Sequence, residues 1–111
     1  MKLSAKEPML DIRRYGKIII FHPHDNVAIA AERIEKGEKL VVGDLEVVIK
    51  ESIPQWHKVA IKPIKKGDYV IKLGCKIGKA SRRINIGEWV STHNLSSHWF
   101  RGRAVWRVRA G

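Results

Sequence analysis

Residues 34–40 read IEKGEKL, and the same pattern returns as IKKGDYV at residues 64–70 and as INIGEWV at residues 84–90. Each copy consists of an isoleucine, two variable residues, a glycine, an acidic residue, a variable residue and an apolar residue. A glycine at this place can adopt positive φ in a tight turn that leads into a strand. The copies begin thirty and then twenty residues apart, which is not the period of a solenoid. The pattern therefore predicts a recurring turn in one compact β structure.

Strand-like segments lie between these turns. A hairpin is signalled by Gly43-Asp44, and only residues 26–34 favour a helix. Asp25 or Asn26 could cap that helix, alanines follow, and Gly37 comes after its end. The segments rich in β-formers are residues 17–21, 40–42, 45–50, 58–61, 69–73 and 89–91, with 76–80 as a weaker candidate. The predicted fold class is mostly β, with short strands, recurring glycine turns and one short helix.

Size and composition limit the class of protein. With 111 residues, of which 44% are hydrophobic, the chain has room for one domain with a modest core. No apolar run has the length of a membrane span, and the N-terminal residues lack the apolar segment of a signal peptide. Cys75 is the single cysteine and cannot form an internal disulfide. We therefore expect a cytoplasmic protein with no membrane partner.

The formal net charge of +11 is unevenly distributed. Residues 62–83 hold eight lysines and arginines against one acid, Asp68, and residues 101–109 hold four arginines and no acid. Such a surface can attract nucleic acid, an acidic protein surface or a small polyanion. A solvated lysine-rich face explains residues 62–83 more simply, because they contain no recognition helix or stacking platform. The sequence therefore does not favour nucleic acid as a partner.

Histidines occur at three places where predicted strands begin or end: HPHDN at residues 22–26, WHK at 56–58 and THN at 92–94. Helix capping is a sufficient structural reason for Asp25 and Asn26. The alternative is a site, because a helix N-terminus suits a carboxylate and imidazoles bind metals or transfer protons. Spacing alone leaves both interpretations open.

Four blocks in order, HPHDNVAIA, IPQWHKVAI, IKKGDYVIKLGCKIGKA and IGEWVSTHN, resemble the small SAF domain of the altronate and galactarate dehydratase family. The resemblance implies a β-clip domain over residues 17–96, which leaves residues 1–16 as an N-terminal extension and 97–111 as a basic Arg/Trp tail. In that family the module is fused to a large catalytic domain or is a separate small subunit. Sulfolactate sulfo-lyase has a similar small subunit.

The resemblance also implies which residues form a site. It carries over three catalytic histidines and four substrate-binding residues: His22, His57 and His93, and Asp25, Asn26, Lys58 and Asn94. We expect the three histidines to lie together at one end of the β structure, beside the helix N-terminus. His24 and His98 fall outside the shared pattern. Two residues depart from the family: Trp56 replaces a glycine, and Ser91 replaces a histidine.

The activity implied is loss of water from an aldonic or aldaric acid. A base removes the proton α to the carboxylate, and the resulting dianionic enediolate needs a divalent metal or cationic groups. One small β domain offers no carboxylate cluster for a metal. We therefore expect an accessory small subunit of a carbon–oxygen hydro-lyase, which forms one wall of the site and is inactive alone. The Fe²⁺ or Mn²⁺ would be held mainly by a large catalytic partner, and no metal ligand is assigned on this chain.

The sequence is also compatible with two other functions. One is a small subunit like that of sulfolactate sulfo-lyase. The other is a non-enzymatic SAF module that binds a carbohydrate or another polyanion. A homodimer is compatible with either alternative.

Overall fold

A computed structural model describes residues 10–96 of the chain. The described part consists of strands, turns and loops and contains no helix, which confirms the mostly-β prediction. The ten strands are β1 (Arg13–Tyr15), β2 (Ile18–Ile20), β3 (Val27–Ala30), β4 (Lys39–Val42), β5 (Leu45–Val48), β6 (Lys58–Ala60), β7 (Tyr69–Lys72), β8 (Cys75–Ala80), β9 (Trp89–Val90) and β10 (Leu95–Ser96). Residues 10–96 include no helix of the length and hydropathy needed to cross a membrane.

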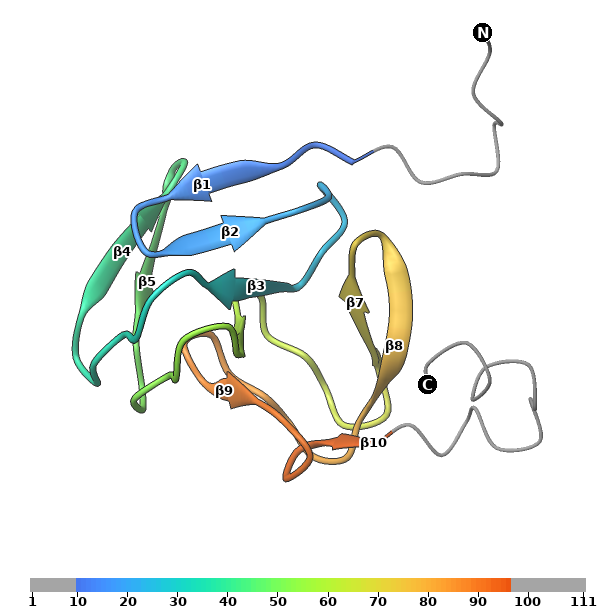
Figure 1. The fold of residues 1–111 in the computed structure, drawn as a ribbon. Coiled ribbons are helices and arrows are strands. Elements are labelled where there is room, and N and C mark those ends of the chain that lie inside the picture. The colour runs from blue at the N-terminus through green and yellow to red at the C-terminus, as the bar shows by residue number, and fades with distance from the viewer. Residues whose placement is uncertain (1–9, 97–111) are drawn as a thin grey trace, which may run out of the picture.

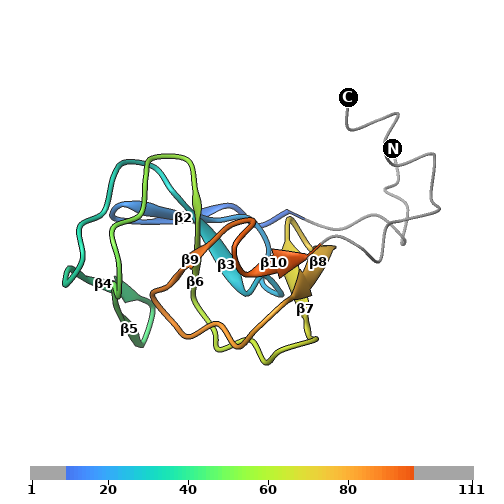
Figure 2. The same ribbon diagram turned by 90° about the horizontal axis from the view of Figure 1, so that it is seen from below.

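The strands form three antiparallel sheets. The largest has the order β1-β2-β3-β6-β9, a second has the order β10-β8-β7, and the third is the β4–β5 hairpin. Figures 1 and 2 both show the β4–β5 hairpin and the β7–β8 hairpin on opposite sides of strands β3, β6 and β9. The central strands are therefore covered on both faces.

Two apolar clusters fill the space on the two faces of the central strands. Alternation along β3 directs Ala28 toward one cluster and Val27 toward the other. The first cluster includes Ala28, Ala30, Val59, Leu40, Val47 and five isoleucines, and the second includes Val27, Ala60, Val90, Val70, Ala80, Ile64 and Ile84. Because all of these side chains except Leu40 are β-branched or small, they pack closely around short strands.

The helix predicted over residues 26–34 is wrong, because residues 27–30 form β3. All four residues of β3 are buried, and they pair with β2 on one side and β6 on the other. A strand that is covered on both faces has a continuous apolar sequence rather than an alternating one. Periodicity cannot separate such a run from a buried helix, and the alanines tipped the prediction toward helix.

The recurring glycine turn is confirmed, and the structure adds a fourth copy that the sequence pattern missed. Gly37, Gly67 and Gly87 have φ angles of 93°, 88° and 90°. The fourth copy lies at residues 53–59, where Trp56 occupies the glycine position with a φ of 69°. In every copy this residue donates its N–H to a backbone carbonyl at least 12 positions away in the chain, as Trp56 does to the Ala30 carbonyl at 2.7 Å.

The four turns are arranged in two pairs. Ile34 forms an antiparallel bridge with Ile53, and Ile64 forms one with Ile84. In each bridge the two isoleucines exchange backbone hydrogen bonds of 2.8–3.0 Å. The isoleucine that opens the sequence pattern is therefore the buried link between turns that are far apart in the chain.

The domain extends beyond the boundary expected on the N-terminal side. Strand β1 lies within residues 1–16, which were predicted as an extension, and it pairs with β2 from Arg13↔Ile20 to Tyr15↔Ile18. The predicted Gly43-Asp44 turn does connect β4 to β5, with a φ of 62° at Gly43. The Arg/Trp tail at 97–111, including His98, lies outside the described residues.

Candidate functional site

The fourth turn differs from the others in two adjacent residues, Trp56 and His57. In the first copy the acidic residue accepts a backbone hydrogen bond, from Glu35 N to Glu38 Oε2, at 2.7 Å. The residue equivalent to Glu35 in the fourth copy is Pro54, which has no N–H to donate. A carboxylate is therefore not needed at position 57, and a histidine can stand there without leaving a backbone donor unpaired.

His57 and His93 both contact the indole of Trp89. The Trp89 Nε1–H donates to His57 Nδ1 at 3.2 Å, and the two rings meet edge-on with centroids 5.4 Å apart. The His93 ring centroid is 5.6 Å from that of Trp89. Both histidines are exposed to solvent. Since His57 Nδ1 accepts a hydrogen bond, the neutral ring carries its proton on Nε2 and can donate a hydrogen bond from there.

Asn94 holds the turn that carries His93. Its side chain is buried, with 2% of the residue exposed. Its Oδ1 accepts the Ser91 N–H at 2.9 Å, and its Nδ2 donates to the Trp89 carbonyl at 2.8 Å. Both polar atoms of the amide are therefore used to fix the backbone between Trp89 and His93.

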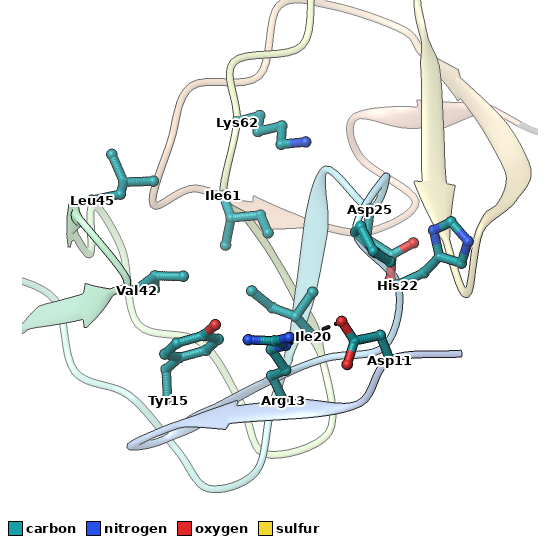
Figure 3. Close-up of a pocket in the computed structure, with 11 residues that line it drawn as sticks. Asp11, Arg13, Tyr15, Ile20, His22, Asp25, Val42, Leu45, Ile61 and Lys62 are labelled. Carbon is teal, nitrogen blue, oxygen red and sulfur yellow. Dashed lines mark hydrogen bonds and ion pairs between the residues drawn. The ribbon is translucent and has the colours of Figure 1, made fainter. Parts of the chain in front are cut away.

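A second candidate place is a hollow of about 390 Å³ around His22 (Figure 3). Arg13 and Tyr15 extend into it from β1, Lys62 lies across from them, and Ile20 and Ile61 supply apolar surface. The remaining lining residues are Asp11, Pro23, Asp25, Val42 and Leu45. Charges of both signs are present, because the Arg13 Nε contacts Asp11 Oδ2 at 3.1 Å.

Asp25 and Asn26 connect the central sheet to the β7–β8 hairpin instead of capping a helix. Asp25 is 1% exposed, and its two oxygens accept the Leu73 and Gly74 N–H groups at 3.1 and 2.9 Å. Asn26 accepts from the Ile71 N–H at 2.8 Å and donates to the Tyr69 carbonyl at 2.9 Å. These bonds give both residues a structural role, and their predicted contact with substrate stays a prediction.

The structure does not gather the three predicted catalytic histidines at one place. Strand β6 begins after His57, beside Trp89, and ends before Ile61, which lines the hollow that contains His22. A strand advances about 3.3 Å per residue, so the two places are roughly 13 Å apart along the chain direction. His57 and His93 lie together, and His22 lies elsewhere, because residues 22–26 connect β2 to the opposite end of β3.

Lys58 lies on the other face of the sheet from Trp89. It is paired with Val90, whereas Trp89 is paired with Val59, and neighbouring residues of a strand point to opposite faces. Lys58 is half-buried, and this burial lowers its pKa, with a further contribution from the positive charge of Lys72. The predicted substrate-binding lysine is therefore separated from the two histidines by the sheet itself.

The altronate/galactarate dehydratase SAF domain family matches residues 11–98. The chain belongs to this family. The match includes β1, which agrees with the sheet boundary in the structure and places the start of the SAF domain before residue 17.

Relatives of two kinds share this SAF domain. An altronate dehydratase of Bacillus subtilis is 39% identical over 80 residues, which are 72% of this chain and 16% of that protein. The (2R)-sulfolactate sulfo-lyase subunit alpha of Chromohalobacter salexigens is 31% identical over 86 residues, 70% of this chain and 92% of that subunit. The same subunit of Paracoccus pantotrophus is 45% identical over 54 residues, 49% of this chain and 81% of that subunit. The chain thus spans about a sixth of the length of the altronate dehydratase.

The part of the SAF domain that the structure describes does not by itself fit a resident divalent metal. Within residues 10–96, no group of three or more histidine, cysteine, aspartate or glutamate side chains is placed to hold an ion. His57 and His93 supply two imidazoles, whereas a catalytic metal site takes three or more protein ligands in the common zinc enzymes. The predicted Fe²⁺ or Mn²⁺ on a partner chain stays a prediction.

Sequence reasoning missed Trp89, the residue that joins the two histidines of this SAF domain. It stands at the variable position of the third turn copy, between Glu88 and Val90. A large aromatic residue at a variable position of this turn could have marked Trp89 as a candidate site residue. Its link to His57 depends on the β6–β9 register, which no single-sequence pattern contains.

Proposed function

We propose that this SAF domain is an accessory subunit or module of a hydro-lyase of the altronate/galactarate dehydratase type. The substrate class is an aldonic or aldaric acid, which loses water between the carbon α to the carboxylate and its neighbour. The observation that carries the proposal is the family match over residues 11–98. The catalytic chain that completes the site is part of the proposal.

His57 and His93 are the residues we assign to the chemistry. The leaving hydroxyl must gain a proton, and a positioned imidazole can supply one. With Nδ1 accepting from the Trp89 indole at 3.2 Å, the exposed Nε2–H of His57 suits a hydrogen-bond donor to the reacting oxygens rather than a source of that proton. We assign the proton transfer to His93, as an imidazolium, which is exposed beside the same indole with the ring centroids 5.6 Å apart. In this proposal His22 has no place at the reacting atoms.

A sulfo-lyase function is the second candidate. It is favoured by the two relatives named as (2R)-sulfolactate sulfo-lyase subunit alpha, one of which is matched over 92% of its length. Both candidates share an α-hydroxy acid substrate and an elimination reaction. They differ in the group that leaves, so one assay with two substrate types can separate them.

The experiment is a reconstitution. The purified chain is mixed with a large chain that resembles the rest of the altronate dehydratases, with Fe²⁺ or Mn²⁺ added. Loss of water from altronate and galactarate, and elimination from sulfolactate, are measured with each chain alone and with the mixture. We expect activity on one of the two substrate types from the mixture only. High turnover by this chain alone in chelator, or no gain on mixing, would contradict the proposal.

The role of His57 is tested in the active mixture. Replacing His57 with alanine should lower kcat by about 10²-fold or more, as expected for loss of a positioned hydrogen-bond donor to a reacting oxygen. The melting temperature should stay unchanged, because the side chain is exposed. His24→Ala is the matched control and should leave kcat unchanged. A large loss of stability in His57→Ala would instead mark His57 as a packing residue.

A further inference from the structure

Trp56 combines a strained backbone with an exposed side chain. Its φ of 69° lies in the left-handed region, and Trp56 and Leu73 are the two non-glycine residues of the described 10–96 segment with positive φ. Bulky residues rarely adopt this conformation, because Cβ crowds the backbone. The strain is not offset by burial, since Trp56 is 63% exposed. Strained residues that persist in a fold are often found at sites of function.

The three equivalent turns show that the fold does not require a side chain here. The same position is glycine in each of them, and a Cβ built on Gly37 or Gly67 meets no atom within 4 Å. The backbone of the fourth turn is fixed independently, because Trp56 N donates to Ala30 O at 2.7 Å and Ala30 N donates to His57 O at 2.9 Å. A glycine would therefore serve the turn better than the tryptophan does.

Trp56 also stands next to the candidate catalytic pair. The residue that follows it is His57, which contacts Trp89, and Trp89 contacts His93. We call these four residues, Trp56, His57, Trp89 and His93, the aromatic edge. Tryptophan is among the residue types that most often contribute large binding energies at protein interfaces.

We propose that Trp56 is an anchor by which the SAF domain binds the catalytic chain, with the aromatic edge as the contact face; this rests on the proposed function. An indole presents 150–250 Å² of largely apolar surface, which suits a protein pocket better than a small polyhydroxylated acid. The matched region is 16% of the B. subtilis altronate dehydratase, so the remaining 84% of that chain is available as a neighbour. Docking at this edge places His57 and His93 against the catalytic chain.

The test compares two substitutions that both relieve positive φ. Trp56→Gly removes the anchor, whereas Leu73→Asn changes the β7–β8 turn, where Leu73 has a φ of 57°. Asparagine tolerates the left-handed region, and glycine adopts it freely. Both variants should melt a few degrees higher than the wild type in a calorimetric scan. Only Trp56→Gly should weaken binding of the catalytic chain, by about 10- to 100-fold in Kd by titration calorimetry.

A third variant and a size measurement complete the experiment. Trp56→Phe keeps a large ring and should lose less affinity than Trp56→Gly. Equal affinity of Trp56→Gly and wild type would overturn the anchor role while leaving the proposed function intact. The anchor role would also be overturned if sedimentation showed a wild-type dimer that Trp56→Gly dissociates without any change in affinity for the catalytic chain. Absence of any complex with the wild-type chain would overturn the proposed function as well.

Discussion

His57 occupies a turn position that carries a carboxylate in the other three copies of the turn. Two neighbours make the exchange possible. Pro54 removes the N–H that a carboxylate would accept, and the Trp89 indole holds Nδ1 of the imidazole at 3.2 Å. The orientation of His57 thus depends on Pro54 and Trp89. A histidine at position 57 indicates a functional site only when these two residues are considered with it.

Substitution of Asp25 distinguishes a structural role of this residue from a substrate-binding role. Replacing it with alanine leaves the Leu73 and Gly74 N–H groups without the buried carboxylate that accepts from both. We expect the free energy of unfolding to fall by about 2–4 kcal/mol, since a hydrogen bond to a charged group contributes about 1.5–3 kcal/mol. Urea denaturation measures this loss.

Asp11 is the control for this experiment. Its ion pair with Arg13 is exposed, so Asp11→Ala should change stability by less than about 1 kcal/mol. A loss of under 0.5 kcal/mol for Asp25→Ala, on the order of an ordinary surface substitution, would contradict the hairpin-holding role.

At the scale of elements, the sequence was sufficient for most of the strands, including the covered β6 and β9, and insufficient for the alanine-rich β3. β4, β5 and β7 were predicted because β-branched residues lie between glycine turns. β3 was not, because its buried VAIA run has no alternation. The fourth turn was invisible because both marker residues, the glycine and the acid, are replaced. Of the candidate site, the pairing of His57 with His93 required a register that only the fold supplies.

The glycine turns are not equivalent in what surrounds them. A Cβ on Gly87 would overlap the Val48 carbonyl oxygen, whereas a Cβ on Gly37 would meet nothing within 4 Å. Gly37→Ala should therefore cost about 1–2 kcal/mol from backbone strain alone. Gly87→Ala should cost clearly more, because the β5 end must move as well. Thermal denaturation of the two variants compares them, and equal losses would contradict the close approach of Val48 to this turn.

At the scale of the whole molecule, positive charge is only partly balanced. The net charge is +11, and the ion pairs described within residues 10–96 involve Arg13, Arg14, Lys17 and Arg33 but not Lys58. Lys58 is half-buried near the positive charge of Lys72, and its pKa is lowered for these two reasons, burial first. The folded state therefore disfavours the charged form of this side chain.

This lowered pKa predicts a pH dependence of stability. Between the folded pKa and the ordinary value of 10.5, the unfolded chain binds more protons at Lys58 than the folded chain does. The free energy of unfolding contributed by this residue must then rise as the pH rises through that window. Lys58→Met should be more stable than wild type at neutral pH, and the difference should shrink toward pH 10.

Urea denaturation at neutral and alkaline pH checks this prediction, with the exposed Lys36→Met as a control that should show a smaller change at both values. A Lys58→Met variant that is less stable than wild type at neutral pH would show that the lysine has a favourable partner in solution.

The central claim is that the aromatic edge, and not the hollow around His22, faces the catalytic chain. Histidine side-chain NMR tests it most directly, because ring nitrogen shifts report on each imidazole separately. The large chain and then a sugar acid are added to the labelled SAF domain. The resonances of His57 and His93 should shift, and those of His22 and His24 should stay in place. Shifts confined to His22 and His24 would contradict the claim and would indicate that the hollow around His22 faces the catalytic chain.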